Sequence, residues 1–342
     1  MRRAFGLVAL VVTLGVATGC GSDPHSSAGA VVKAGAAVDV AASAAATTTL
    51  TVPVGTITLA LGDPVTSVDG DKTAGGNDVE APDGGELVPV GWSFATRPLW
   101  GGMLALEPHE ADVSLVVDGK AYPLGSPYSV DGNALANSSD TDFYLAIPGK
   151  PQPKDLTVRV DYDGGAQEVA VGTGKPVAGS RDLATLGEVA PAGVDCPSTG
   201  WSSSDPKLDL RLDCRISMVG ETPYYPGVGW APAGKVFRVV NVPELRLLDA
   251  VDNSGTGSTT YRVAGIVDHS TLAGGRSATA LRQASPTQEY VAGGTLVFRT
   301  AADAQAPLRL SVAFRLEEDD VRGGSKAPDT RTVTITRKIP LR

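Results

Sequence analysis

The stretch LTVRVDYDGGAQEVAV, residues 156–171, decides the fold class of this chain. In residues 156–162 every second side chain is apolar and the intervening ones are polar, which is the period of a strand with one buried face. Asp163-Gly164-Gly165 follows at once and is a hairpin-turn signal. The chain then returns through Val169 and Val171, so we predict two antiparallel strands here.

The same alternation recurs along the chain. It is found at residues 57–61, 113–117, 143–147 and 308–316, and Asp118-Gly119 ends the second of these runs. No segment carries a sustained apolar stripe of helical period between helix caps. Short alternating runs separated by Gly, Pro and Asp are typical of an antiparallel sandwich, so the predicted fold class is all-β.

The strand pattern occurs twice. The alternating leucines of residues 208–212 repeat the alternation of residues 57–61 at an offset of 208 − 57 = 151 residues. Pro89-x-Gly91-x-x-Phe94 recurs as Pro232-x-Gly234-x-x-Phe237, and we expect each copy to open a strand. The repeat predicts two related β-sandwiches in tandem.

The boundaries of the two sandwiches follow from composition. We assign residues 48–175 to the first and residues 180–342 to the second, each with its own core. A Gly- and Pro-containing linker at about residues 173–190 separates them. One large sandwich whose strands look alike is the alternative.

The first twenty residues have the pattern of an export signal. Arg2 and Arg3 precede an apolar run, residues 4–16, which is too short to span a bilayer and fits a signal-peptide core. The run ends in Ala17-Thr18-Gly19-Cys20, which resembles a lipobox, where bacterial lipoproteins are cleaved before an acylated cysteine. We therefore expect residues 1–19 to be removed and a lipid on Cys20 to anchor the chain at the outer face of the bacterial cell membrane. An ordinary secretory peptide with a chance cysteine is the alternative.

A polar segment follows the lipobox. Residues 20–47 are rich in Ala, Ser, Gly and Thr and hold almost no large side chains. A segment of this composition buries too little apolar surface to order itself. We therefore expect a flexible, disordered tether between Cys20 and the first sandwich.

The order of features over residues 48–342 resembles a known group of domains. An early strand is followed by an irregular loop, the Pro-x-Gly-x-x-Phe opening, a hairpin and an extended pair of strands. This order is similar to the telokin-like immunoglobulin domains of lipoproteins and secreted antigens of Gram-positive bacteria. The resemblance implies immunoglobulin-like sandwiches in an extracytoplasmic protein, and it brings no catalytic residues with it.

The charge balance narrows the class of partner. Lys and Arg number 29 against 38 Asp and Glu, a net charge of −9 at pH 7. A nucleic-acid binder would show a basic excess on its surface, so we predict no nucleic-acid partner. The chain has three His and three Cys, which leave few ligands for zinc or haem, so we also predict no cofactor.

The two cysteines beyond Cys20 are predicted to form a disulfide. Cys196 and Cys214 are an even number in an exported chain, where disulfides persist. Cys214 shares its parity with the leucines of residues 208–212, so it should point into the core. A bond would hold the Pro-, Gly- and Ser-rich segment around Cys196 over that core. Two free buried thiols are the alternative.

An acidic loop is a candidate calcium site. Counted from Asp69, oxygen-bearing side chains occupy positions that a helix–loop–helix calcium loop uses; they are Asp69, Asp71, Thr73, Asn77 and Glu80. Position 6, where such loops need glycine, is Ala74. The alternative is a flexible acidic connection without a cation.

Two histidines and a set of aromatic residues are the other candidates. His109 adjoins Glu110 and His269 follows Asp268, but neighbouring strand residues point to opposite faces and no nucleophile is placed by sequence. The GxSxG, Walker, GxGxxG and HExxH motifs are absent. Aromatic residues in or beside Gly- and Pro-rich stretches could form a binding face or fill the ends of the sandwiches; they are Trp92, Trp100, Trp201, Trp230, Tyr224 and Tyr225.

Together these features predict a non-catalytic cell-surface lipoprotein that presents two immunoglobulin-like modules to a protein or an envelope polymer. The competing hypothesis is an enzyme, or an accessory subunit of a cell-wall enzyme, with a shallow site where the modules meet. A pocket that gathers His109, His269 and carboxylates would favour the enzyme. Their separation would favour the binding module.

Overall fold

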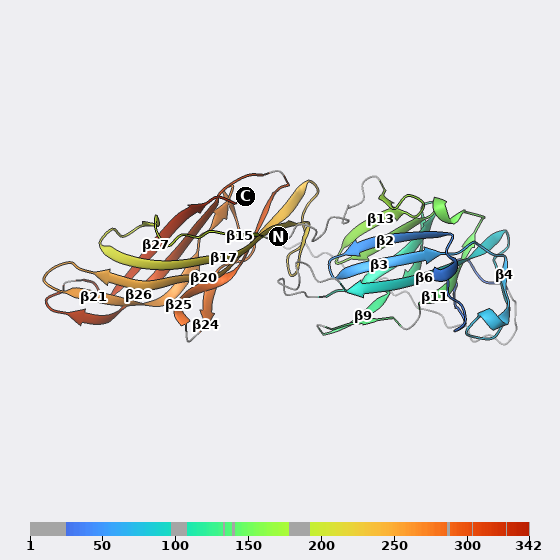
Figure 1. The fold of residues 1–342 in the computed structure, drawn as a ribbon, viewed down its shortest axis with the longest axis horizontal. Helices are drawn as coiled ribbons and strands as arrows, with labels where there is room; N and C mark the ends of the chain where they lie inside the picture. The colour runs from blue at the N-terminus through green and yellow to red at the C-terminus, as the bar shows by residue number, and fades with distance from the viewer. Residues whose placement is uncertain are drawn as a thin grey trace, which may run out of the picture.

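The computed structural model describes residues 25–96, 108–132, 134–138, 141–177, 192–285, 288–302, 304–325 and 327–341. This part of the chain is all-β, as the alternation predicts, and its helices are 3-10 turns at Ala41–Ser43, Gly70–Lys72 and Pro153–Asp155. Its sheets are antiparallel and consistent with β-sandwiches. Figure 1 shows two groups of strands side by side along the long axis of the molecule.

The first group consists of two five-stranded sheets, here called the first sheet pair. One sheet has the order β1 (Val31–Lys33), β11 (Asp142–Pro148), β6 (Gly85–Thr96), β3 (Gly55–Leu61), β2 (Ala46–Val52). The other has the order β14 (Lys175–Pro176), β13 (Gly165–Ala170), β12 (Thr157–Tyr162), β7 (Ala111–Val117), β8 (Lys120–Gly125). Two short hairpins accompany them, β4 (Ser67–Val68) with β5 (Val79–Glu80) and β9 (Tyr128–Asp131) with β10 (Ala134–Asn137).

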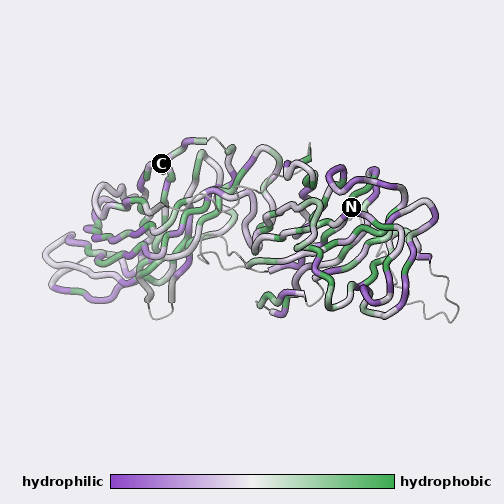
Figure 2. Tube along the Cα trace, turned by 45° about the vertical axis from the view of Figure 1, so that its right-hand side comes forward, coloured by the Kyte–Doolittle hydropathy of each residue, from purple (hydrophilic) through white to green (hydrophobic). Residues whose placement is uncertain are grey.

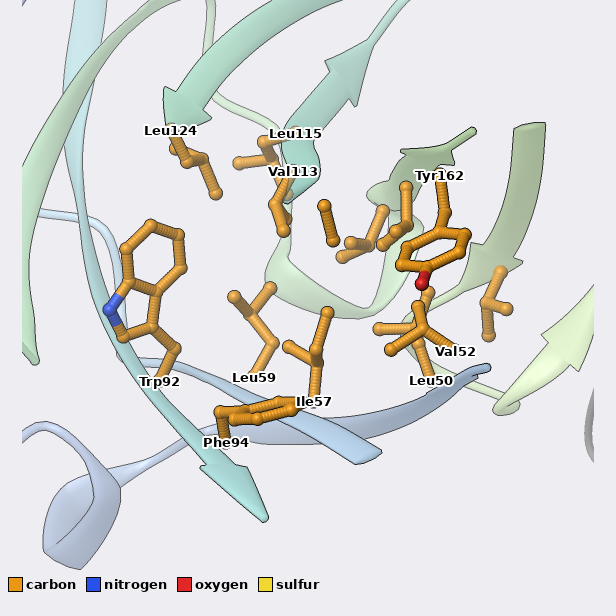
Figure 3. Packing of buried hydrophobic residues seen from close by; sticks show 14 of the residues in the cluster. Leu50, Val52, Ile57, Leu59, Trp92, Phe94, Val113, Leu115, Leu124 and Tyr162 are labelled. Atoms are coloured by element: carbon orange, nitrogen blue, oxygen red, sulfur yellow. The ribbon is translucent and has the colours of Figure 1, made fainter. Parts of the chain in front are cut away.

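The apolar faces of these two sheets meet in one core. Figure 3 shows Ile57 and Leu59 of β3 facing Val113 and Leu115 of β7. All four side chains are buried, and they are the apolar members of the alternating runs. The period-two pattern therefore identifies the inward face of each strand correctly.

Two Asp-Gly turns close hairpins in this group. Asp118 and Gly119 have φ angles of 49° and 77°, and Asp163 and Gly164 have 45° and 72°. A two-residue hairpin whose central residues both have positive φ is a type I′ turn, which Asp-Gly favours. These turns join β7 to β8 and β12 to β13, so both predicted hairpins are confirmed.

The second group is one eleven-stranded sheet, here called the second sheet. Its main path is β15 (Ala192–Val194), β17 (Leu208–Thr222), β20 (Lys235–Asp252), β21 (Ser258–Asp268), β26 (Leu308–Arg322), β22 (Thr271–Leu272), β23 (Gly275–Arg276). Off this path, β16 (Ser202–Ser203) pairs with β27 (Thr330–Ile339), β27 with β26, β25 (Gln288–Ala301) with β20, and β24 (Arg282–Ser285) with β25. A short hairpin, β18 (Tyr224–Tyr225) with β19 (Gly229–Trp230), projects between β17 and β20.

The second sheet encloses its own buried cluster, but the first core also reaches into it. The alternating residues of β26, from Leu308 to Leu316, are fully buried in the second cluster. The first cluster, however, extends to residues of the second sheet and of the β18–β19 hairpin region, namely Met218, Tyr224, Ala231, Phe237, Val239 and Val297. The expectation of two separate cores therefore needs correction. In Figure 2 hydrophobic segments follow the strands, and hydrophilic ones gather at the outer turns.

The segment expected to be a disordered tether is ordered from His25 onward, so that expectation is wrong for residues 25–47. β1 pairs with β11 as an edge strand. Val40 is buried, and its amide donates a hydrogen bond to Asp142 Oδ1 at 3.0 Å. Small side chains are enough to order this segment, because β11 provides hydrogen-bond partners for the backbone of β1, and β6 and β11 provide the apolar surface against which the segment packs. The composition of residues 25–47 does not reveal that β11 is the pairing partner of β1.

The two Pro-x-Gly-x-x-Phe copies have different roles. Pro232 and Gly234 form a turn before β20, whereas Pro89 lies inside β6, which already begins at Gly85. The prediction that each copy opens a strand is therefore wrong for the first copy. Pro89 is tolerated there because its backbone faces Gly62, just beyond the end of β3, and its carbonyl oxygen accepts a hydrogen bond from the Gly62 amide. The missing N–H of Pro89 therefore removes no hydrogen bond from the β3–β6 ladder.

Candidate functional site

A disulfide fastens a crossing segment to the edge of the second sheet. Cys196 and Cys214 are bonded, with their Cα atoms 5.4 Å apart, as predicted. Residues 195–207, here called the strap, follow β15, which pairs with β17, and include β16, which pairs with β27. Cys214 belongs to the second buried cluster, and Cys196 packs against it. The strap thus covers the side of this core between β17 and β27.

A groove of about 360 Å³ lies between the strap and the sheet. We call it the strap groove; its lining is Ser198, Thr199, Gly200, Trp201, Ser202, Ser203, Leu208, Asp209, Leu210, Leu212 and Ile335. Gly200 has φ 78°, which a glycine adopts without strain, and a Cβ there would lie 2.7 Å from Arg337 Nη1. The turn that lets the strap pass over the groove therefore depends on this glycine.

The strap groove combines one aromatic ring with polar rims. Trp201 is half-buried against the second cluster, and its indole Nε1 donates to Pro197 O at 3.0 Å, which fixes the ring. The hydroxyl groups of Ser198 and Thr199 and the carboxylate of Asp209 are exposed beside it. An aromatic plane bordered by hydrogen-bonding groups can bind a sugar ring or an extended peptide.

A buried ion network holds the end of the strap. Arg331 on β27 pairs with Asp205 of the strap and with Asp252 of β20, and its Nε donates to Tyr261 Oη at 3.1 Å. Asp252 is fully buried, and hydrogen bonding from Ser254 holds the pKa of its carboxyl below the usual value. The network ties three strands and the strap together, so the groove has a rigid frame.

A second set of candidate residues meets where the two groups of strands touch. The β18–β19 hairpin packs against the β12–β13 turn, a contact we call the joint. Trp230 Nε1 donates to Tyr162 O at 2.7 Å, and Tyr224 Oη donates to Asp163 Oδ2 at 3.0 Å. The rings of Tyr224 and Trp230 lie 4.8 Å apart, and burial raises the pKa of Tyr162 to about 12. These tyrosines therefore stay neutral near pH 7.

The histidines and carboxylates of the enzyme hypothesis do not gather in one pocket. His109 lies at the joint, with its Nε2 3.9 Å from Asp163 Oδ2 and its ring edge-on to Tyr162. His269 lies in the turn between β21 and β22, and its amide donates to Ser311 O on β26. The two histidines thus lie in different parts of the fold, His109 before β7 and His269 between β21 and β22. None of the four described grooves contains either of them.

The calcium hypothesis is not supported by the geometry of the loop. Thr73 is buried and donates to the carbonyl oxygens of Gly70 and Asn77, so it braces the loop from inside. Asp69 pairs with Lys72, and Glu80 pairs with His25. Over the described ranges, no three His, Cys, Asp or Glu side chains lie close enough to hold a metal ion. Asp69, Asp71, Thr73 and Asn77 thus lie in the connection between β4 and β5, and Glu80 lies in β5.

Most of the aromatic candidates are structural. Trp92 packs edge-on against Phe143 inside the first core, and Tyr224 and Trp230 fill the joint. Trp201 lines the strap groove and is half-buried, whereas Trp92, which borders a second groove, is buried in the first core. Trp100 lies outside the described residues. The sequence signal for the strap groove is Trp201 in a Ser- and Thr-rich segment next to Cys196. The opposite wall of the groove, formed by β17 and β27, depends on strand pairing, which the sequence does not reveal.

The membrane-anchor prediction falls outside the described residues, because Cys20 and residues 1–19 lie before His25. Most of the predicted linker at about 173–190 is also outside them. In the part of the chain with described structure, no helix has the length and apolar character to cross a bilayer. No family model, curated protein or solved structure matches this chain.

Proposed function

We propose that this chain is a non-catalytic lipoprotein, anchored through Cys20 at the outer face of the bacterial cell membrane, that binds a protein or an envelope polymer. The strap groove carries the proposal. It joins a fixed indole ring, exposed hydroxyl groups and a carboxylate on a frame braced by a disulfide and a buried ion network. A rigid frame limits the entropy lost on binding.

Two features support the extracytoplasmic location. The lipobox-like Ala17-Thr18-Gly19-Cys20 follows an apolar run of signal-peptide length. The Cys196–Cys214 disulfide fits an oxidising compartment outside the cytoplasm. In this proposal the first sheet pair and the second sheet are the two immunoglobulin-like modules of the predicted tandem, with the first module extended to include residues 25–47.

The joint supports a specific way of presenting the groove. Because Trp230 and Tyr224 bond to the β12–β13 turn, the second sheet is held on the first sheet pair by more than the connecting chain. The strap would then be displayed at a set distance from the membrane. A groove held at a constant distance from the membrane is suited to binding a ligand that is itself fixed in the cell envelope.

The test is a pull-down from native envelope with the mature chain carrying Cys20→Ser. We expect the chain to capture a ligand, and Trp201→Ala to reduce capture at least tenfold because it removes the aromatic plane. Val267→Ala is the matched control, since Val267 is an exposed apolar residue of β21 and does not line the groove. Equal capture by both variants would refute the groove as the site.

The lipid anchor is tested by expressing the wild-type chain and its Cys20→Ser variant in the bacterial cells from which the envelope is prepared. Cys20→Ser should release the protein into the medium or leave it uncleaved, because two or more acyl chains are needed for stable anchoring. Mass analysis of the membrane-bound protein should show lipid on Cys20. An unmodified Cys20 in the membrane fraction would contradict the anchor.

A further inference from the structure

Four residues form a row across four strands of the second sheet. Thr271 of β22 stands directly opposite Arg276 of β23 and, on its other side, opposite Arg309 of β26. Arg309 in turn stands opposite Lys338 of β27. Directly opposite residues in an antiparallel sheet project from the same face. We call Arg276, Thr271, Arg309 and Lys338 the basic row.

The basic row points to solvent. The adjacent row consists of Leu272, Leu308 and Ile339, which are 3%, 0% and 1% exposed and belong to the second buried cluster. Successive side chains of a strand alternate between faces. The basic row must therefore lie on the outer face, and its three charged residues are all exposed.

The charges of the row are not neutralised within the described structure. Like charges directly opposite each other destabilise a sheet. Elsewhere the second sheet places an acid opposite an arginine, as with Arg262 and Glu317 at 2.7 Å and Arg211 and Asp249 at 2.8 Å. Among the described residues, no Asp or Glu forms an ion pair with any member of the basic row.

The neighbouring positions on the same face add no negative charge. Two residues along from Arg309 is Ser311, which is buried, and two along from Lys338 is Thr336; their hydroxyl oxygens lie 3.0 Å apart. His269 precedes Thr271 by two positions and is exposed. The row is thus a cationic strip with no carboxylate at these neighbouring positions, on a chain whose net charge is −9.

We propose that the basic row binds a linear polyanion of the cell envelope, with charges carried by phosphate diesters or carboxylates. The row crosses three inter-strand steps of about 4.8 Å, or about 14 Å in all, which suits a chain lying across the strands. Arg gives paired hydrogen bonds to either anion, and Thr271 adds a hydroxyl between two of the charges. This inference rests on the proposed function and gives it a second surface and a ligand chemistry.

The test uses the mature chain with Cys20→Ser and defined polymers. Linear inorganic polyphosphate and polygalacturonate separate the two anion types, and neutral dextran is the blank. We expect calorimetric binding of at least one polyanion. For three charge contacts, a slope of about −0.7 per contact gives a loss of affinity of about 20-fold between 50 and 200 mM salt.

The variant pair isolates the row from net charge. Arg276→Gln, Arg309→Gln and Lys338→Gln together should weaken polyanion binding at least tenfold and flatten the salt dependence. The control removes three exposed lysines of the first group of strands and its connections, as Lys72→Gln, Lys150→Gln and Lys175→Gln, and should change affinity less than twofold. Equal losses in the two variants would overturn the row as the site.

The outcomes also separate this inference from the proposed function. A wild-type chain that captures a ligand from native envelope but binds neither polyanion would refute the basic row alone. A chain that captures nothing from the envelope and binds no polyanion would refute both. Binding to the polyanions that the Trp201→Ala variant retains would support the row as a surface distinct from the strap groove.

Discussion

The joint can be tested by adding one methyl group at Gly165. Gly165 begins β13 and lies under the indole of Trp230. A Cβ built on Gly165 would lie 2.7 Å from Trp230 Cδ1 and closer still to Nε1 and Cε2. The backbone of Gly165 does not have positive φ, so alanine itself fits the strand, and the cost of Gly165→Ala comes from the indole.

The magnitude follows from the contacts that the indole would lose. Overpacking a well-filled site costs about 1–3 kcal/mol. Displacing Trp230 would also weaken its 2.7 Å bond to Tyr162 O, which contributes about 1 kcal/mol. Removing a glycine from a strand returns about 0.5–1 kcal/mol. We therefore expect Gly165→Ala to lower the free energy of unfolding by about 2 kcal/mol.

A double-mutant cycle makes the prediction specific to the joint. Trp230→Ala should lower the free energy of unfolding by about 3 kcal/mol, near the low end for a large aromatic side chain because Trp230 is only half-buried. In that background Gly165→Ala should be neutral or stabilising, since the clash is gone. The coupling should then be about 2 kcal/mol.

Urea unfolding of the full chain, followed by far-ultraviolet circular dichroism, measures all four corners of the cycle. Gly193→Ala is the matched control, because a Cβ on Gly193 would meet nothing nearer than 3.8 Å. It should leave stability within about 0.5 kcal/mol of the wild type. If Gly165→Ala were equally destabilising with and without Trp230, the β18–β19 hairpin would not pack on the β12–β13 turn and the description of the joint would be wrong.

Three further predictions concern the second sheet. Reducing the Cys196–Cys214 bond, which spans 18 residues, should destabilise the protein by about 3 kcal/mol; two titratable thiols in denatured, unreduced protein would contradict it. Asp252→Asn should cost about 3 kcal/mol at pH 7, because it unbalances the buried pair with Arg331. Since the pKa of Asp252 is lowered in the fold, its contribution is complete above the unfolded value of about 4 and is lost as pH falls, so denaturation curves of wild type and variant should converge in acid. Arg309→Glu should raise stability by about 0.2–1 kcal/mol, because it places an acid opposite Lys338, and an unchanged or lower melting temperature would contradict the cost assigned to the basic row.

Local patterns predicted the elements of this fold well. The alternating residues of β3, β7, β12 and β26 are buried as expected, because the period of a strand depends on the chain itself. The parity of Cys214 likewise placed its side chain in the core. The Asp-Gly turns needed no distant partner either, since their positive φ angles are a local preference.

The errors share a physical cause, which is dependence on a distant partner. Residues 25–47 look disordered from composition, but their backbone partners are supplied by distant segments, β11 for residues 31–33 and β3 for residues 45–47. The joint could not be predicted because the Asp163 turn and the Tyr224–Trp230 hairpin are about 60 residues apart, with no pattern linking them.

The basic row shows why surface function is harder to predict than core packing. Each of its residues is an ordinary exposed position in an alternating strand, and the chain as a whole is acidic. Only the register of β23, β22, β26 and β27 brings residues 276, 271, 309 and 338 into line. A shift of one residue in any of these pairings would turn that strand's member toward the core. The buried row beside it, Leu272, Leu308 and Ile339, therefore sets the register that the core requires, and this register also aligns the charges on the outer face.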